Sequence, residues 1–205
     1  MKTIKQSYEL LDEINGEEIL KRIEKIARVC YKSEDKMTEN SCFKFVKMLV
    51  DKGHHAMLEH VSISVKFITN RGVTHELVRH RLASYAQEST RYCNYLKNDF
   101  GAEITVIEPV YLAKGTRPYN NWFNACVLSE VSYFDLLKIG LTAQEAREVL
   151  NNSTKTEIVV TANLREWMTI LKLRTSEQAH PQMRALMLPL LQELQEKLNV
   201  IFGGI

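Results

Sequence analysis

The sequence predicts an α+β fold built as one domain over residues 1–205. Segments with helical periodicity outnumber segments that alternate like strands, and the strands do not alternate regularly with helices as they do in a doubly wound sheet. Hydrophobic residues make up 45% of the chain and charged residues 25%, which is the balance of a globular protein that buries a sizeable core without disulfides or metals.

Two helices are expected near the beginning of the chain. Residues 16–31 carry apolar side chains at helical spacing. Residues 39–52 do the same, with Thr38 as an expected N-cap and Gly53 just beyond the end. The side chains expected to face inward are Ile19, Ile23, Ile26 and Cys30 in the first helix, and Cys42, Val46 and Leu49 in the second.

After residue 53 the spacing of the apolar side chains changes from a helical to an alternating pattern. Residues 61–67 alternate apolar and polar side chains, which predicts a half-buried strand. Residues 72–78 are expected to form a short helix, and residues 104–107 a short strand that ends before Pro109. A long helix is expected over residues 117–138.

The last third of the chain shows two capping patterns. Thr142 and Glu145 form a capping box for a short helix that carries Arg147, and residues 156–161 predict a buried strand. Asn163 and Glu166 resemble a second capping box. The helix after it is expected to turn Leu164, Trp167, Met168 and Leu171 inward, and a last helix over residues 182–202 is expected to kink or restart at Pro189.

Charge and cysteine usage narrow the function classes. The formal net charge is only +2, so no global field is expected to recruit nucleic acid or an anionic membrane. No apolar run approaches the roughly 20 residues of a spanning helix, and the beginning does not resemble a signal peptide. Without a C-x-x-C pair, the cysteines are expected to be reduced, mostly buried thiols of a cytoplasmic protein. They are Cys30, Cys42, Cys93 and Cys126.

The densest polar cluster is Arg79-His80-Arg81, followed by Ser89 and Arg91. No glycine-rich phosphate loop occurs, so arginines would have to hold any phosphate. On a helix, Arg79 and Arg81 would face opposite sides and serve two ligands or two subunits. A solvated basic face is the ordinary interpretation, but hydroxyl and aromatic neighbours favour anion and ring contacts. These neighbours are Ser84, Tyr85, Ser89, Thr90, Tyr92 and Tyr95.

Two alternatives stay open on the residues alone. The Arg79–Arg91 segment with its interleaved tyrosines also fits an RNA- or nucleotide-binding module without chemistry. A cluster of imidazoles and a carboxylate suggests a metal-dependent hydrolase, although neither H-E-x-x-H nor its inverse occurs. That cluster consists of His54, His55, Glu59 and His60. A third polar cluster runs from Asn163 to Trp167 and on to Arg174.

Four ordered motifs resemble those of the flavin-dependent thymidylate synthases. Arg79-His80-Arg81 with Ser89 matches the signature R-H-R-x7-S. The upstream segment from Gly53-His54 to Glu59-His60, the pair Ala146-Arg147 with Leu150, and the run Asn163-Leu164-Arg165-Glu166-Trp167 resemble three further segments of the family. The resemblance spans residues 53 to about 184.

The resemblance implies a mixed or antiparallel sheet packed with long helices, assembled as a homotetramer with active sites at chain interfaces. It implies FAD as cofactor, dUMP as substrate, methylenetetrahydrofolate as carbon donor and NADPH as reductant. The implied products are dTMP and tetrahydrofolate, formed without a cysteine nucleophile and without a metal. Nucleic-acid and membrane partners are not expected.

Site residues are carried over position by position. Arg174, Ser89 and Arg79 would be catalytic, with Arg174 stabilising negative charge on the uracil and Ser89 hydrogen-bonding the nucleotide. FAD contacts are implied for Ala56, Glu59, Arg79, His80, Arg81, Gln87, Asn163, Arg165 and Thr169. dUMP contacts are implied for Glu76, Arg79, Gln87, Glu88, Ser89, Thr90, Arg91, Arg147 and Arg174.

Three segments depart from the family pattern. Glu76 stands where glutamine is common, and its contact is expected to use the backbone because an ionised carboxylate cannot donate. Asn151 replaces the usual proline after Leu150, which is expected to loosen that turn while sparing Arg147. His180 and Gln182 lie in a segment that differs from the family's A-Q-x-E-I-R, so no FAD contact is assigned to them.

Overall fold

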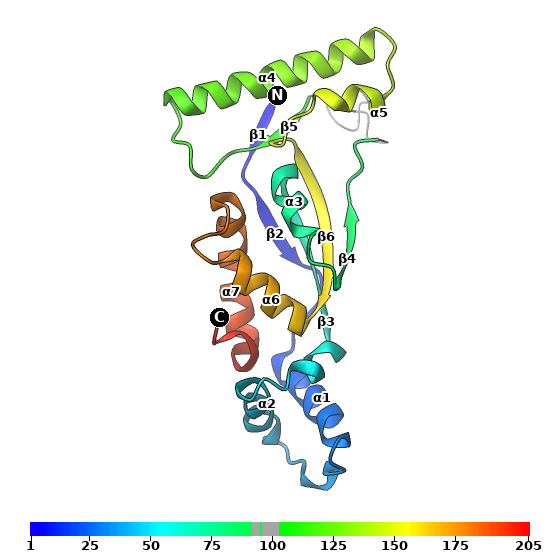
Figure 1. Cartoon of the computed structure of the whole chain (residues 1–205), viewed down its shortest axis with the longest axis vertical. Coiled ribbons are helices and arrows are strands. Elements are labelled where there is room, and N and C mark those ends of the chain that lie inside the picture. Colours follow the sequence, from blue (N-terminus) through cyan, green and yellow to red (C-terminus); the bar gives the residue numbers. More distant parts are fainter. Residues whose placement is uncertain (92–94, 96–102) are drawn as a thin grey trace. The chain divides into compact units, whose positions relative to one another are not determined.

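The structure is a computed structural model that describes residues 1–91, Tyr95 and residues 103–205 (Figure 1). Tyr92 and Cys93 lie outside the described residues. The strands are β1 (Lys2–Ile4), β2 (Ser7–Leu10), β3 (Ser62–Asn70), β4 (Ala83–Gln87), β5 (Thr105–Ile107) and β6 (Lys155–Asn163). The helices, with η marking short 3₁₀ helices, are α1 (Gly16–Val29), η1 (Glu34–Lys36), α2 (Ser41–Asp51), η2 (His55–His60), α3 (Arg71–Leu77), α4 (Arg117–Lys138), α5 (Ala143–Ala146), η4 (Arg147–Val149), α6 (Leu164–Arg174) and α7 (Pro181–Phe202).

The described strands form two sheets. One has two parallel strands, β1 and β5, with Lys2 opposite Thr105 and Ile4 opposite Ile107. The other has four strands in the order β2-β3-β6-β4. The predicted α+β fold with long helices is therefore confirmed.

Backbone hydrogen bonds fix the direction of the central pair. The N–H of Leu164 donates to the carbonyl of Val61, and the N–H of Arg71 donates to the carbonyl of Thr154. The residue numbers increase along β3 while those of their hydrogen-bonding partners decrease along β6, so the two strands are antiparallel. Burial alternates along both strands, which confirms the period-2 pattern expected for residues 61–67. β6 alternates in the same way, and Val159 is half-buried. The prediction that this strand is buried on both faces was therefore wrong.

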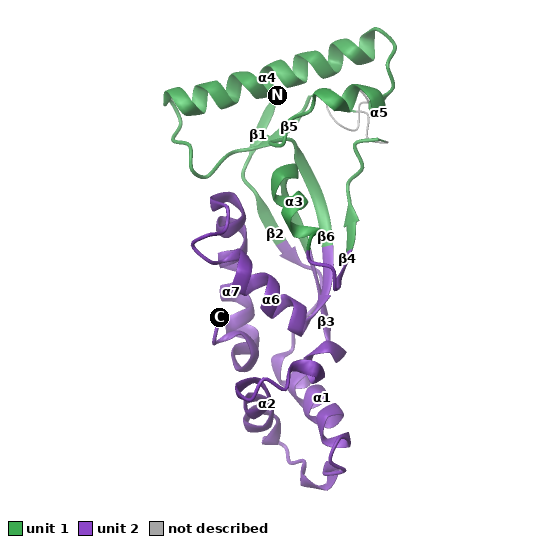
Figure 2. Ribbon diagram, in the orientation of Figure 1, with its two compact units in different colours: residues 1–8, 66–79, 85–159 green, residues 9–65, 80–84, 160–205 purple. Residues whose placement is uncertain are grey.

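The chain divides into two compact units (Figure 2). Unit 1 comprises Met1–Tyr8, Lys66–Arg79 and Tyr85–Val159, and unit 2 comprises Glu9–Val65, His80–Ser84 and Val160–Ile205. The single domain expected over residues 1–205 stays a prediction.

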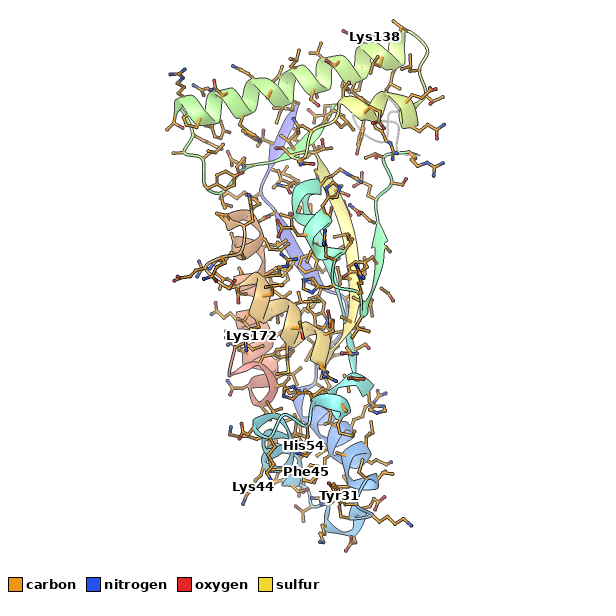
Figure 3. The ribbon with its side chains drawn as sticks, viewed as in Figure 1. Tyr31, Lys44, Phe45, His54, Lys138 and Lys172 are labelled. Carbon is orange, nitrogen blue, oxygen red and sulfur yellow. The ribbon has the colours of Figure 1, made fainter. Side chains whose placement is uncertain are left out.

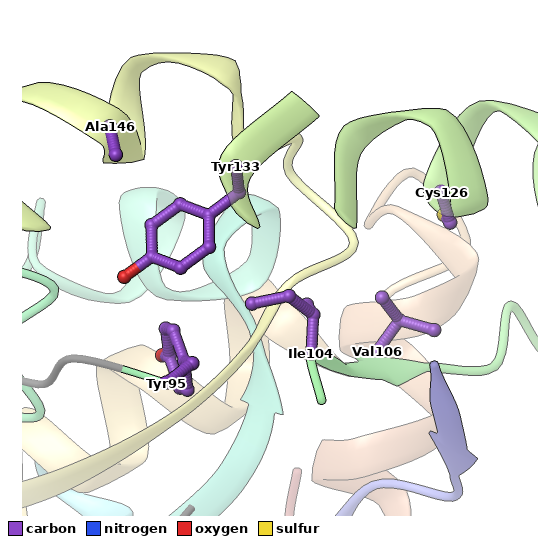
Figure 4. Packing of buried hydrophobic residues seen from close by; sticks show 6 residues of the cluster. All are labelled: Tyr95, Ile104, Val106, Cys126, Tyr133 and Ala146. Carbon is purple, nitrogen blue, oxygen red and sulfur yellow. The ribbon is translucent and has the colours of Figure 1, made fainter. Parts of the chain in front are cut away.

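The core of unit 1 forms beneath the long helix α4 (Figure 4). Tyr133 of α4 is fully buried, and its ring meets Tyr95 edge-on with centroids 5.8 Å apart. Such an aromatic pair contributes packing beyond the apolar area it buries. The remaining buried members of this cluster are Ile104, Val106, Cys126 and Ala146.

In unit 2, helices α6 and α7 pack on each other, and α2 packs on both α1 and α7. Trp167 of α6 is fully buried, and its indole Nε1 donates to the carbonyl of Ile63 at 2.9 Å. This bond satisfies the polar end of a large apolar side chain and ties α6 to β3 within the unit.

Several local expectations were wrong. The buried face of α1 consists of Leu20, Ile23, Glu24, Ala27 and Arg28, so the helix is rotated relative to the predicted stripe and Cys30 is exposed. Glu24 and Arg28 are buried as a pair, with Arg28 Nε 2.7 Å from Glu24 Oε1. Apolar spacing alone could not indicate a paired polar face.

Two terminus predictions also need correction. α2 begins after Asn40 as N-cap, not Thr38, because the backbone of Thr38 is held by the Ser41 hydroxyl. α7 keeps helical torsions at Pro189, and its interruption lies at Leu198, with φ −139° and ψ 47°. Strands β1, β2 and β4 were not predicted.

The close approach of α1 and α7 in unit 2 gives the first testable prediction. A Cβ added at Gly16 would meet the backbone carbonyl oxygen of Lys197, whereas a Cβ at Gly204 would have no atom within 4 Å. Gly16→Ala should therefore lower the free energy of unfolding by about 1–3 kcal/mol, measured by urea unfolding. Gly204→Ala is the matched control and should leave it unchanged; equal stability of the two variants would contradict the packing described here.

Candidate functional site

The segment after strand β4 in unit 1 is anchored by charges. Glu88 Oε2 lies 3.1 Å from Lys155 Nζ, and the hydroxyl of Tyr95 donates to Glu88 Oε1 at 3.3 Å. The Lys155 ammonium also contacts Glu157 Oε1 at 2.6 Å, and Glu157 pairs in turn with Lys66. Two carboxylates and two ammonium groups therefore alternate through this network.

These ion pairs shift the pKa values of Lys155 and Glu157. Burial lowers the pKa of Lys155, but hydrogen bonds to Glu157 and Glu88 outweigh it, so that the pKa is raised overall. Hydrogen bonds from Lys155 and Lys66 lower the pKa of Glu157. Both groups are consequently charged at neutral pH, and Glu88 is held by a fixed ammonium.

Two predicted nucleotide-binding residues meet beside this network. Thr90 is buried, and its Oγ1 lies 3.4 Å from Arg147 Nη1. Arg147 is the first residue of η4, directly after α5, and the capping box predicted for Thr142 and Glu145 is confirmed at the start of α5. The backbone N–H of Arg91 donates to Ser89 Oγ at 3.3 Å, which closes a tight turn.

Gln87 is engaged inside unit 1. Its amide nitrogen donates to Thr74 Oγ1 at 2.9 Å and to Thr156 Oγ1 at 3.3 Å. These bonds fix the end of β4 against α3 and β6. Glu76 lies half-buried on α3.

A cavity of about 380 Å³ lies beside the network in unit 1. Its volume is in the range of small-molecule sites. The residues that line it are Lys66, Ala86, Glu88, Lys155, Glu157, Ile158 and Val159.

In unit 2, helix α6 brings three polar side chains together. Arg174 Nε donates to His80 Nε2 at 3.1 Å, and His80 Nδ1 lies 3.5 Å from Glu166 Oε1. Glu166 and Arg174 are eight residues apart, which places them about 80° apart around the helix axis and on one side of it. The structure thus joins the R-H-R run to the segment that the third polar cluster occupies.

Burial shifts the pKa values of His80 and Glu166. Burial and the nearby Arg174 cation lower the pKa of His80, so the imidazole is neutral at pH 7. Burial raises the pKa of Glu166, with Arg165 opposing the rise. Arginine can only donate hydrogen bonds, so His80 must be neutral to accept one from Arg174.

The remaining predicted flavin residues of unit 2 lie around α6. Asn163 caps the helix by accepting the N–H of Glu166 at 2.9 Å, and Arg165 pairs with Glu59 of η2. Ala56 is exposed on η2. Arg165 and Thr169 line a cavity of about 640 Å³.

Cationic side chains are prominent in that cavity. Lys47 and Lys172 line it together with Arg165; Lys172 lies on α6 (Figure 3). His55 also lines the cavity. An anionic ligand would be stabilised there. The other lining residues are Val50, Asp51, Met168, Asn199, Val200, Ile201, Gly203, Gly204 and Ile205.

The R-H-R run does not lie on a helix, contrary to the geometry considered above. α3 ends at Leu77, and residues 79–81 occupy the turn before β4. Arg79 and Arg81 are exposed while His80 is buried. The separation of the two arginines therefore comes from a turn and not from helical phase.

The histidine segment forms no metal cluster in the part of the chain that the structure describes. There, no group of three or more His, Cys, Asp or Glu side chains is placed to hold an ion. His55 Nε2 lies 3.2 Å from the carbonyl of Val50 instead. Among the described helices, none combines the length and apolar character needed to cross a membrane.

Sequence reasoning missed the partners of the site. Lys155 was not singled out, and Glu166 was assigned only to a capping box. Asn163 does cap the helix, but the Glu166 carboxyl faces His80. Neither contact leaves a local signal, because each partner lies tens of residues away along the chain.

Comparisons with known proteins agree with one another. The family model for "Thymidylate synthase complementing protein" matches residues 9–198. A flavin-dependent thymidylate synthase of Pyrococcus abyssi is 32% identical over 166 residues, covering 80% of this chain and 67% of that protein. One from Geobacter sulfurreducens is 31% identical over 183 residues, covering 86% and 77%.

Among solved structures, the UMP/dUMP methylase PolB from Streptomyces cacaoi, bound with 5-Br dUMP, superposes with a TM-score of 0.81. It is 24% identical, and the match covers 99% of this chain and 96% of that one. This likeness shows a shared fold.

The charge network of unit 1 predicts an acid-sensitive contribution to stability. Because the pKa of Glu157 is lowered below its usual 4.5, its stabilisation is present above that pH and is lost as the pH falls further. Glu157→Gln should cost about 1 kcal/mol at pH 7, as expected for a partly exposed pair, and should flatten the acid limb of stability. Urea unfolding between pH 7 and pH 3 measures both effects.

The control is Glu196→Gln, at an exposed position of α7. It should follow the wild-type pH dependence. An unchanged acid limb in Glu157→Gln would contradict the role given to Lys155 and Lys66.

Proposed function

The chain belongs to the family of flavin-dependent thymidylate synthases, and on that premise we propose that it converts dUMP to dTMP. Methylenetetrahydrofolate would donate the carbon, FAD reduced by NADPH would supply hydride, and tetrahydrofolate would be released. The observation that carries this proposal is the contact between Arg174 and His80, which unites two stretches that the resemblance assigns to one active site.

The donor set of unit 2 fits a flavin dinucleotide. The cavity beside α6 gathers Arg165, Lys172 and Lys47, and cations of this kind stabilise a diphosphate. The Asn163 cap uses only its carbonyl oxygen, which leaves the amide nitrogen able to donate. When bound, FAD supplies hydride transfer, while the protein supplies orientation and electrostatics.

The further FAD contacts in the proposal follow the resemblance. They involve both arginines of the R-H-R run, the buried imidazole between them, η2, the end of β4 and helix α6. The residues are Ala56, Glu59, Arg79, His80, Arg81, Gln87 and Thr169, in addition to Asn163 and Arg165.

The nucleotide site is proposed in unit 1. Arg147 is held beside Thr90, and a guanidinium with a neighbouring hydroxyl is suited to a phosphate monoester. Glu88, fixed by Lys155, would accept from the sugar. Glu76, Arg79, Gln87, Ser89 and Arg91 complete the proposed set.

Arg174 would activate the base. Making C5 of uracil nucleophilic moves electron density toward O4 and N3, and a positioned cation stabilises charge where it develops. No cysteine nucleophile is needed. Cys42 and Cys126 are buried, and burial raises the pKa of each thiol, which keeps both in the unreactive neutral form.

Assembly completes the proposal. A homotetramer would bring segments from several chains to each active site, and these interfaces would also admit the folate and NADPH. Oligomeric mass in solution, measured by light scattering, tests this part.

The decisive experiment is an assay with the purified protein. Flavin absorption should appear in the visible spectrum, and oxidation of the reduced flavin should depend on added dUMP and methylenetetrahydrofolate. Failure to bind flavin, even when it is supplied, would overturn the proposal. Salt-sensitive RNA binding without turnover would point to the nucleotide-binding alternative.

Arg174→Ala should lower kcat by roughly 100- to 1000-fold, as expected for loss of one charge-stabilising donor. Bound flavin per chain should change little, because the guanidinium acts on the charged intermediate. Arg22→Ala, at an exposed position of α1, is the control. Parallel loss of flavin and turnover would remove Arg174 from this role.

Arg147→Ala should weaken dUMP binding roughly 10- to 100-fold, since a hydrogen-bonded charge contributes about 1.5–3 kcal/mol. Titration of the flavin spectrum with dUMP measures the affinity. Arg117→Ala removes an exposed arginine of the same unit and should leave the affinity unchanged. Unaltered dUMP affinity in Arg147→Ala would exclude it from the phosphate site.

A further inference from the structure

The contact between Arg174 and His80 specifies where the imidazole proton lies. Arg174 Nε donates to His80 Nε2 at 3.1 Å. An arginine has no acceptor, so Nε2 must carry the lone pair. The single proton of the neutral ring is therefore on Nδ1.

The other side of the ring faces a carboxyl group. His80 Nδ1 lies 3.5 Å from Glu166 Oε1, and the two side chains are only 7% and 11% exposed. A carboxylate near one ring nitrogen favours the tautomer with the proton on that nitrogen. Glu166 and Arg174 thus favour the same tautomer from opposite sides.

We propose that Glu166 is a positioning residue, whose carboxyl oxygen keeps the His80 proton on Nδ1 and thereby preserves Nε2 as the acceptor that orients Arg174. The inference rests on the proposed function for its effect on turnover. Its structural part, the tautomer, stands on the geometry of unit 2 alone.

The alternative states of the ring show why the carboxyl group matters. With the proton on Nε2, or on both nitrogens, an N–H would point at the Arg174 N–H and the hydrogen bond would be lost. Burial and the Arg174 cation lower the pKa of His80, which removes the doubly protonated form at pH 7. Desolvation does not choose between the two neutral tautomers, so that choice depends on the groups that face the ring nitrogens, Arg174 at Nε2 and Glu166 at Nδ1.

The substitution that removes the acceptor is Glu166→Met, which keeps a side chain of similar length. Glu166→Gln keeps an oxygen that can accept from Nδ1. The first readout is the ¹⁵N spectrum of the flavin-loaded protein with labelled histidine, with His80 assigned by its loss in His80→Gln. Wild type and Glu166→Gln should show His80 protonated on Nδ1, and Glu166→Met should shift His80 toward the other tautomer.

The second readout is the split between kcat and KM. Misplacing a reacting group by about 1 Å can cost up to about 100-fold, so Glu166→Met should lower kcat on that scale. Bound flavin and the KM for dUMP should stay near wild type. Glu166→Gln should recover most of kcat. Glu196→Met, an exposed position on α7, is the matched control and should behave as wild type.

Three results would overturn the inference. They are a wild-type His80 protonated on Nε2, a Glu166→Met protein whose His80 tautomer is unchanged, and a Glu166→Met protein with wild-type kcat per bound flavin. If Glu166→Met fails to fold, Glu166→Ala removes the same acceptor and tests the same point. If the wild-type protein shows no dUMP-dependent turnover, the proposed function fails, whereas the spectrum still decides the tautomer.

Discussion

In the proposed mechanism a cation must be held in place beside the substrate, and the contact between Arg174 and His80 is an orienting hydrogen bond to a neutral ring. An imidazole acceptor orients the guanidinium through one hydrogen bond but adds no negative charge. The burial that keeps the ring neutral also strengthens the field of the cation. Helix α6 holds Arg174 through the buried Trp167, whose indole is bonded to β3. The packing of unit 2 and the electrostatics of the site are therefore linked.

Apolar spacing and capping residues predicted the helices whose bounds depend on neighbouring residues in the sequence. The bounds expected for α4 match Arg117–Lys138, and the capping box of α5 is present. β1 and β2 escaped prediction because they are three and four residues long and gain stability from distant partners; Lys2, for example, pairs with Thr105. The rotation of α1 escaped prediction for a related reason, since an ion pair between Glu24 and Arg28 occupies the buried face.

The residues of the candidate site also fall into two groups, those that local sequence patterns indicated and those that depend on distant partners. Two of the motifs identified His80 and Arg147 as candidates, and the family resemblance added Arg174. It could not reveal Lys155 or Glu166, whose importance arises from where their partners lie in space. Glu166 also had a satisfactory local explanation as a capping residue, and that explanation concealed the carboxyl group's contact with His80. Residues with adequate local roles are those in which a positioning role is most easily missed.

Asn151 illustrates how one chain can depart from a family pattern without losing the geometry that the pattern serves. A proline at this position would fix the turn after Arg147 through its ring. Asn151 does so through hydrogen bonds, since its Oδ1 accepts the N–H of Ser153 at 3.0 Å and its amide nitrogen lies 3.4 Å from the Cys126 sulfur. An asparagine that bonds its own backbone two residues on stabilises a turn. Two contacts of Asn151 therefore hold this turn, and Arg147 lies beside Thr90.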